Sequence, residues 1–181
     1  MKVLVAYASK NGSARTCVER LREQLKKVDV TVADLCLEQP NVADYDIVIF
    51  GSSVRFGNML PAARRFLKEQ EPILLQKSLG LFLVCGLELE YDHYRDTFFS
   101  DKLLSHAFLT IYFGGSLRSK GLPLFDKIFL KSVRSGILEE GIDNGDYSPN
   151  MPCILPENVD RMASCVMTEI GNLAKKAQEK E

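Results

Sequence analysis

A dense cluster of small and polar residues near the start of the chain could bind an anion. It comprises Ser9, Lys10, Asn11, Gly12 and Ser13, with Ala14 directly after it. The cluster follows a short apolar run and precedes a stretch with helical periodicity. A loop in this position offers unpaired backbone N–H groups and the positive end of a helix dipole to a phosphate group. We expect a phosphate site here; an ordinary capped turn is the alternative.

This loop differs from two common nucleotide-binding motifs. It is neither a Walker A loop nor a GxGxxG sequence, so neither an NTPase nor a dinucleotide-binding protein is supported. A hydrolase has little support either, because the chain has no GxSxG motif and neither His93 nor His106 has an evident nucleophile partner. We assign no catalytic residue from the sequence.

Two later loops could hold a planar ring. The first begins after Gly51 and contains Ser52, Ser53, Val54, Arg55, Phe56 and Gly57. The second contains Cys85, Gly86 and Leu87 and reaches Tyr91. Small residues allow close backbone approach, and the two aromatic residues offer flat faces. A phosphate site with aromatic loops beyond it suits a mononucleotide with a large ring; packing for the aromatics and a surface ion pair for Arg55 are the alternatives.

The elements that must position these loops alternate between strands and helices. Apolar or β-branched runs predict strands at residues 2–7, 30–37, 45–50, 79–85 and 108–113. Helical spacing predicts helices at residues 14–28, from Pro61 onward, at 92–106 and at 159–177. This alternation predicts a doubly wound α/β fold, a five-stranded parallel sheet with helices on both faces. Ligands of such sheets bind outside the carboxyl ends of the strands, where all three loops should lie.

The length of 181 residues predicts a single domain, 1–181. The five predicted strands and the final helix leave residues 116–156 as an insert after the fifth strand. Within it, residues 122–135 have an apolar side and a basic side, as in a helix that lies on a membrane surface. Packing on its own domain and binding of a partner are the alternatives for this helix.

Composition limits the partners. A net charge of −1 gives no global positive field to attract nucleic acid, so we expect no nucleic-acid binding. The longest apolar run has about half the ~20 residues that a membrane-spanning helix needs, and the N-terminal apolar stretch is too short for a signal peptide. Five scattered cysteines without a CxxC pair predict reduced thiols and no metal site. We expect a cytoplasmic protein, with peripheral contact at the inner face of the membrane as an alternative.

The loops together resemble those of flavodoxins, and most closely the flavodoxin-like, quinone-dependent protoporphyrinogen oxidases. Residues 9–12 are similar to that family's phosphate loop, residues 53–57 to its flavin loop, and residues 115–118 with 125–127 to its inserted segment. The resemblance covers nearly the whole chain and implies the flavodoxin strand order 2-1-3-4-5. It also implies FMN, with its phosphate held by Ser9, Asn11, Gly12 and Ser13 and its ring between Phe56 and the loop from Gly86 to Tyr91.

The sequence departs from the family pattern at two points. Ala14 stands where a threonine usually contacts the phosphate, and the chain has no tryptophan to stack on the flavin. The resemblance implies an FMN-dependent oxidoreductase that passes electrons from a reduced organic substrate through flavin to a quinone. Dedicated flavodoxin carriers are strongly acidic, which the net charge of −1 does not match. An electron carrier with a protein redox partner and a flavin-free interaction module are the alternatives.

Overall fold

The computed structural model describes residues 1–86, 88–115 and 154–179. Five strands form its parallel sheet: β1 (Lys2–Ala8), β2 (Asp29–Asp34), β3 (Ile47–Arg55), β5 (Ser78–Val84) and β6 (Leu109–Tyr112). Their order in the sheet is β2-β1-β3-β5-β6. This order confirms the prediction of a doubly wound flavodoxin-like sheet with the order 2-1-3-4-5. Because the winding direction reverses between β1 and β3, the carboxyl ends of these strands form the expected ligand edge.

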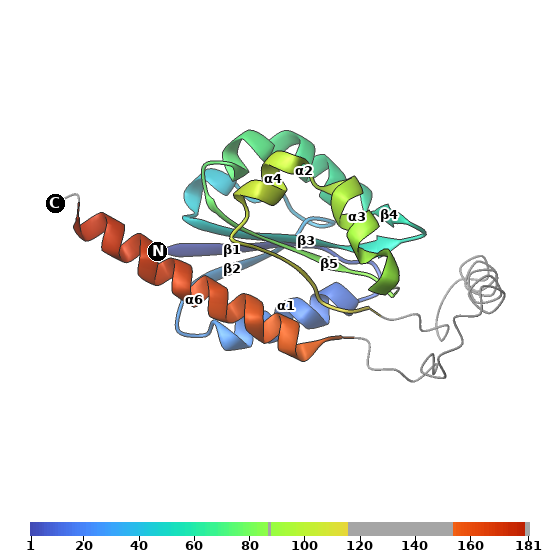
Figure 1. Cartoon of the computed structure of the whole chain (residues 1–181), viewed down its shortest axis with the longest axis horizontal. Helices are drawn as coiled ribbons and strands as arrows, with labels where there is room; N and C mark the ends of the chain where they lie inside the picture. The colour runs from blue at the N-terminus through green and yellow to red at the C-terminus, as the bar shows by residue number, and fades with distance from the viewer. Residues whose placement is uncertain (87, 116–153, 180–181) are drawn as a thin grey trace.

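Helices cover both faces of the sheet (Figure 1). One face carries α2 (Pro61–Leu74), α3 (Tyr91–Phe98) and α4 (Asp101–His106), and the other carries α1 (Ser13–Gln24) and α6 (Pro156–Gln178). Each face has its own buried apolar cluster, one around Phe50 and Phe66 and one around Phe82 and Phe113. Coverage on both faces explains why the central strands are nearly continuous apolar runs.

The segment 92–106 is two helices, whereas the sequence predicted one. Phe99 takes an extended conformation between α3 and α4 and is buried with its ring edge-on to Phe50. Ser100 then starts α4, because its hydroxyl group accepts a hydrogen bond of 3.3 Å from the Leu103 N–H. Burial of Phe99 therefore requires the break that helical periodicity alone did not indicate.

The predicted loop after the third strand is instead a hairpin. β3 continues to Arg55, and β4 (Asn58–Met59) returns antiparallel to it, so that Arg55 pairs with Asn58. Phe56 and Gly57 at the turn have positive φ values of 51° and 69°. Two successive left-handed residues are typical of the tight turn that matches the twist of paired strands. The Asn58 side chain donates a 2.9 Å hydrogen bond to the Phe56 carbonyl oxygen and closes this turn.

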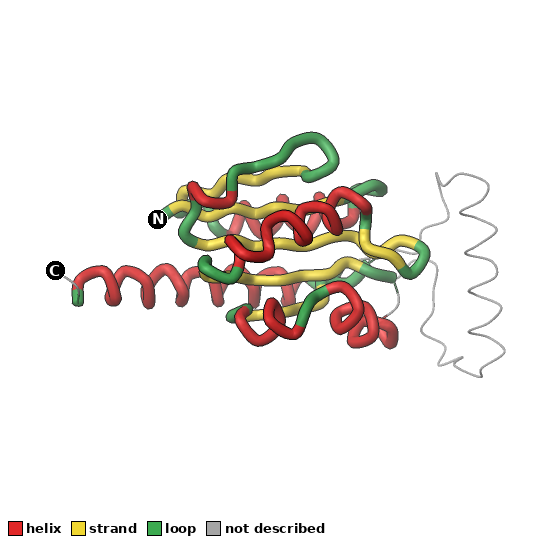
Figure 2. The backbone as a smooth tube through the Cα atoms, turned by 90° about the horizontal axis from the view of Figure 1, so that it is seen from above, coloured by secondary structure: helices red, strands yellow, loops and turns green. Residues whose placement is uncertain are grey.

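The final helix α6 agrees with the prediction for residues 159–177 and begins three residues earlier, at Pro156. Its start lies against the end of β6, where the Leu155 N–H donates to the Phe113 carbonyl oxygen and the Asn158 amide donates to that of Tyr112. The C-terminal part of α6 extends beyond the sheet, at the end where the N-terminus lies (Figure 2). Within the described residues, none of the helices is both long and apolar enough to cross a membrane.

The predicted helix at 122–135 and nearly all of the predicted insert, 116–156, lie outside the described residues.

Candidate functional site

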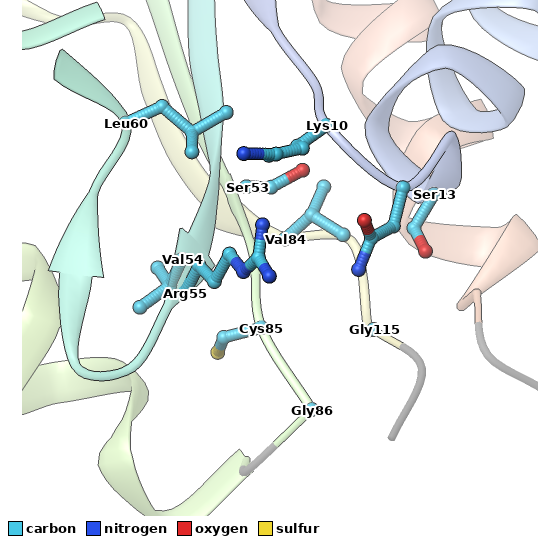
Figure 3. A pocket seen from close by; sticks show the side chains of 11 residues that line it. Lys10, Ser13, Ser53, Val54, Arg55, Leu60, Val84, Cys85, Gly86 and Gly115 are labelled. Atoms are coloured by element: carbon cyan, nitrogen blue, oxygen red, sulfur yellow. The ribbon is translucent and has the colours of Figure 1, made fainter. Parts of the chain in front are cut away.

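A pocket lies at the carboxyl ends of the strands, where the sequence placed the site (Figure 3). Its lining comes from the loop after β1 and the start of α1, the ends of β3 and β5, and the segments after β4, β5 and β6. The lining residues are Lys10, Asn11, Ser13, Ser53, Val54, Arg55, Leu60, Val84, Cys85, Gly86 and Gly115. The fold thus brings together residues from all three loops identified in the sequence.

Eight of these lining residues were predicted site residues, and three were not: Leu60, Val84 and Gly115. Leu60 precedes α2, Val84 ends β5, and Gly115 follows β6. Val84 could have been predicted, because it is the last strand residue before Cys85. The positions of Leu60 and Gly115 in the pocket depend on the hairpin and on the packing of β6, which the sequence did not predict. Other predicted residues stand outside the lining: Ser9, Gly12, Ala14, Ser52, Phe56, Gly57 and Tyr91. Leu87 lies outside the described residues.

The loop between β1 and α1 has the features of an anion site. Gly12 is the N-cap of α1 with a φ of 88°, and no described side chain caps the helix there. The first turn of α1 carries no acidic residue. The Ser9 hydroxyl oxygen is buried and has no hydrogen-bond partner among the described residues. Unpaired N–H groups at a helix start and a buried hydroxyl without a partner fit a phosphate group.

Ala14 contributes differently from its neighbours. Its side chain is fully buried in the apolar cluster that contains Val18 and Phe82. The methyl group therefore belongs to the core, and only the backbone N–H at this position could serve an anion.

An ion pair between α1 and β2 supports the loop that joins β1 to α1. The Arg15 guanidinium donates to the Asp34 carboxylate at 3.2 Å and to the Tyr7 hydroxyl oxygen at 3.3 Å. These hydrogen bonds, with Tyr7 first, raise the pKa of Arg15. The second carboxylate oxygen of Asp34 accepts from the Cys36 N–H at 3.0 Å. The first turn of α1 is thereby tied to the ends of both β1 and β2.

The hairpin between β3 and β4 contributes Arg55 to the pocket lining, and Phe56 at its turn lies outside the lining. The Arg55 guanidinium lies over the Phe56 ring, 4.9 Å from its centroid. Phe56 is 43% exposed. Arg64 on α2 donates to the Asn58 side chain at 3.2 Å, so α2 also supports the turn.

The ends of β5 and β6 meet at the opposite side of the pocket. The Tyr112 hydroxyl group donates a 3.0 Å hydrogen bond to the carbonyl oxygen of Cys85. Gly115 lies so close to this carbonyl group that a Cβ atom would collide with it. The Tyr91 ring packs on Tyr112 at 5.4 Å, and its buried hydroxyl group has no hydrogen-bond partner within the described parts of the chain. Burial raises the pKa of Tyr91 to about 12, so this phenol is neutral at physiological pH.

The charges of the pocket and of its surroundings differ. Lys10 and Arg55 are cationic, and the described lining contains no carboxylate. Acidic residues follow in and near α3, where Arg95 forms 2.7 Å ion pairs with Asp92 and Asp96. Within the described residues, no three His, Cys, Asp or Glu side chains gather as metal ligands. The charges of the described lining therefore suit an anionic group.

Several solved structures are similar in fold. Flavodoxin 2 from Bacillus cereus is 21% identical, with a TM-score of 0.49 over 77% of this chain and 99% of that one. A Fusobacterium nucleatum flavodoxin bound to flavin mononucleotide is 15% identical, with a TM-score of 0.46 and the same coverage. A Lactobacillus acidophilus flavoprotein in complex with FMN is 15% identical, with a TM-score of 0.46 over 61% of this chain and 92% of that one.

Sequence comparison gives a relative and a family. The protoporphyrinogen IX dehydrogenase (quinone) of Escherichia coli K12 is 30% identical over 73 residues, which are 38% of this chain and 40% of the relative. The match thus spans about two fifths of that relative's length. A family model described as a flavodoxin domain matches residues 4–140, most of the chain. This match confirms the resemblance seen in the loops: the chain belongs to the flavodoxin family.

Proposed function

We propose that this protein is an FMN-dependent oxidoreductase that passes electrons from a reduced organic substrate through the flavin to a quinone. Membership of the flavodoxin family supports FMN as the cofactor. The similarity to a protoporphyrinogen IX dehydrogenase (quinone) supports the finer proposal, in which the electron donor is a porphyrinogen. The catalysed reaction, the donor and the quinone are all part of this proposal.

The observation that carries the cofactor proposal is the buried Ser9 hydroxyl group beside the uncapped start of α1. Each hydrogen bond to a charged group contributes roughly 1.5–3 kcal/mol, so several such bonds at one phosphate give a firm anchor. Ser9, Asn11, Gly12 and Ser13 would hold the phosphate. The hairpin with Phe56 and the end of β5 would flank the ring.

Bound FMN would supply the electron chemistry, and the chain would supply binding, orientation and electrostatics. Phe56 at the hairpin tip offers an exposed aromatic face toward which a planar ring could stack. Lys10 and Arg55 would keep the pocket positive. In our proposal the protein is cytoplasmic, and peripheral contact with the membrane through residues 122–135 is an alternative that would bring it to the quinone.

The cofactor proposal is tested by absorbance. Purified protein is mixed with excess FMN, desalted, and compared with a sample treated with riboflavin, which lacks the phosphate group. We expect flavin bands to remain with FMN and to be much weaker with riboflavin. Equal retention of both flavins would contradict a phosphate site at residues 9–14.

The reaction is tested with the FMN-loaded protein, protoporphyrinogen and a menaquinone analogue. We expect porphyrin fluorescence to rise well above the rate of autoxidation, and to require both the flavin and the quinone. Absence of this rise would refute the proposed substrate and leave the cofactor proposal intact.

A second candidate function is an electron carrier without small-molecule turnover. The exposed acidic residues Glu88, Glu90 and Asp92 beside the pocket favour it, because negative charge steers carriers to basic partners. The pairing of Arg95 with Asp92 and Asp96 reduces that charge. Fast reduction by a flavodoxin reductase, with no oxidation of the porphyrinogen, would favour the carrier.

A further inference from the structure

The start of α1 carries a cation where a helix favours an anion. Gly12 is the N-cap, and Arg15 occupies the third position of the helix, in a first turn without acidic residues. A positive charge at this end of a helix opposes the helix dipole. Ser13, two residues before Arg15, lines the pocket, whereas Arg15 lies outside the lining (Figure 3). Because residues two positions apart point to different sides of a helix, the Arg15 side chain is directed to another part of the fold.

The Arg15 side chain has two buried partners there. Its guanidinium group donates to the Asp34 carboxylate at 3.2 Å and to the Tyr7 hydroxyl oxygen at 3.3 Å. Asp34 is the last residue of β2 and is 8% exposed, and Tyr7 near the end of β1 is 4% exposed. Arg15 thus connects the first turn of α1 to the ends of two neighbouring strands.

Asp34 also supports the segment that follows β2. Its second carboxylate oxygen accepts a 3.0 Å hydrogen bond from the Cys36 N–H. The Leu35 N–H donates to the Tyr7 carbonyl oxygen at 2.8 Å and continues the pairing with β1. Burial raises the pKa of the Cys36 thiol above its usual value, and a hydrogen bond with the Ser9 backbone opposes this shift. The segment after β2 therefore contacts the loop at residues 9–14 at its first residue.

The loop at residues 9–14 is thus supported at both ends, by Cys36 beside Ser9 and by Arg15 directly after Ala14. We propose that Arg15 and Asp34 are positioning residues of the phosphate site, because their ion pair holds the start of α1 in the arrangement that binds the phosphate group of FMN. A site that is ordered before the ligand arrives loses less conformational entropy on binding. Neither side chain contacts the ligand. This inference rests on the proposed function, since it requires FMN in the pocket.

An effect of charge alone would have the opposite sign for Asp34. A carboxylate near a phosphate site repels the phosphate group, so removal of its charge would then strengthen FMN binding. A positioning role means that the same removal weakens FMN binding. Loss of the Arg15 charge weakens binding in both cases. The variant Asp34→Asn therefore separates positioning from simple attraction and repulsion.

The experiment measures the dissociation constants of FMN and riboflavin by fluorescence titration, with urea denaturation of each variant. The variants are Arg15→Gln, Asp34→Asn, the double variant, and Arg15→Lys, which keeps the charge of the ion pair. Tyr7→Phe keeps the buried ring and loses only the bond from Arg15, so it tests the same network if Asp34→Asn does not fold. Arg20→Gln is the matched control, because it breaks a 2.7 Å ion pair with Asp160 on the same helix outside the pocket lining.

We expect Arg15→Gln and Asp34→Asn each to weaken FMN binding about five- to tenfold and to change riboflavin binding less than about twofold. The double variant should resemble the weaker single variant, because both changes break the same pair. Arg15→Lys should recover most of the affinity, Tyr7→Phe should weaken FMN binding selectively, and Arg20→Gln should leave both constants unchanged.

Tighter FMN binding by Asp34→Asn, or equal losses for FMN and riboflavin in the Arg15 and Asp34 variants, would overturn the inference and leave FMN binding intact. If Asp34→Asn does not fold, unchanged FMN affinity in Tyr7→Phe would have the same meaning. If the wild-type protein retains no FMN, the proposed function and the inference both fail.

Discussion

The hydroxyl group of Tyr112 on β6 donates a 3.0 Å hydrogen bond to the carbonyl oxygen of Cys85, the residue that follows β5. This bond lies at the ends of two neighbouring parallel strands, directly at the pocket. It orients the chain as it leaves β5 toward Gly86. One side chain on the edge strand thus shapes a pocket wall that belongs to the adjacent strand.

We predict that Tyr112→Phe distorts this wall without unfolding the protein. The variant leaves the Cys85 carbonyl group without this donor, which costs about 1 kcal/mol for a partly buried bond. We expect the free energy of unfolding to fall by that amount and FMN affinity to fall several-fold. Urea denaturation and fluorescence titration with FMN measure the two effects. Tyr45→Phe is the control, because Tyr45 directly follows the short helix η1 (Val42–Asp44) and lies outside the pocket lining, and it should leave FMN affinity unchanged.

Gly115 is predicted to tolerate no side chain. A Cβ atom there would collide with the carbonyl group of Cys85 and approach the Gly86 nitrogen, and these are backbone atoms that cannot rotate away. Gly115→Ala should therefore push the ends of β5 and β6 apart and abolish tight FMN binding. The control is Gly171→Ala on α6, where no described atom outside the neighbouring backbone of the helix lies within 4 Å of the new methyl group. That change should stabilise the helix by roughly 0.5–1 kcal/mol. Retained FMN affinity in Gly115→Ala would contradict the close packing.

Much of the fold follows from patterns within short stretches of the sequence. The five parallel strands and α6 are visible as apolar runs or helical stripes, because both faces of the sheet are covered and each helix buries one side. The break between α3 and α4 is different. It depends on Phe99 reaching Phe50 across the core, a contact between residues about fifty positions apart that no local pattern contains.

The site could be predicted to a similar extent. The loop at residues 9–14 and the ends of β3 and β5 were found because ligands bind at the carboxyl ends of parallel strands. Gly115 and Leu60 were missed because their places in the pocket depend on how β6 and the hairpin pack. The hairpin was not predicted because its turn contains Phe56, and a large aromatic residue rarely adopts the left-handed conformation of a tight turn.

Ser9→Ala is predicted to have opposite effects on stability and on binding. The Ser9 hydroxyl oxygen is buried without a partner within the described residues, so its removal should leave the FMN-free protein equally stable or slightly more stable. Loss of a hydrogen bond to a phosphate should weaken FMN binding roughly tenfold or more. Riboflavin binding should not change, because riboflavin has no phosphate group. Equal losses for FMN and riboflavin would assign Ser9 a purely structural role.

The pair of Arg20 on α1 and Asp160 on α6 predicts a dependence of stability on pH. Two hydrogen bonds of 2.9 and 2.7 Å join these side chains, and the bond with Arg20 lowers the pKa of Asp160. A carboxyl group with a lowered folded-state pKa stabilises the fold above its unfolded pKa, near 3.9, and loses this effect as the pH falls through the folded value. Asp160→Asn should therefore lower the Tm at pH 7, with a difference that shrinks in acid. Asp29→Asn on β2 is the control, and an equal response there would contradict the assignment.

We predict that Phe56 adopts a strained backbone conformation and that its ring contributes to FMN binding. Its φ of 51° is left-handed, which costs roughly 1–2 kcal/mol for a residue with a side chain. The contact with Arg55 returns about 0.5–1 kcal/mol. Asparagine accepts this conformation readily, so Phe56→Asn should raise the free energy of unfolding of the FMN-free protein by about 0.5–1 kcal/mol. Gly57→Ala, at a φ of 69°, should lower it by a similar amount.

The same Phe56→Asn variant should bind FMN more weakly than the wild-type protein, because it lacks the aromatic ring that we propose to flank the flavin. Urea denaturation gives the stability and fluorescence titration gives the affinity. A higher free energy of unfolding together with a weaker affinity for FMN would indicate that Phe56 contributes to binding and destabilises the FMN-free fold. If the variant is less stable and binds FMN with unchanged affinity, the Phe56 ring stabilises the hairpin and does not contribute to FMN binding.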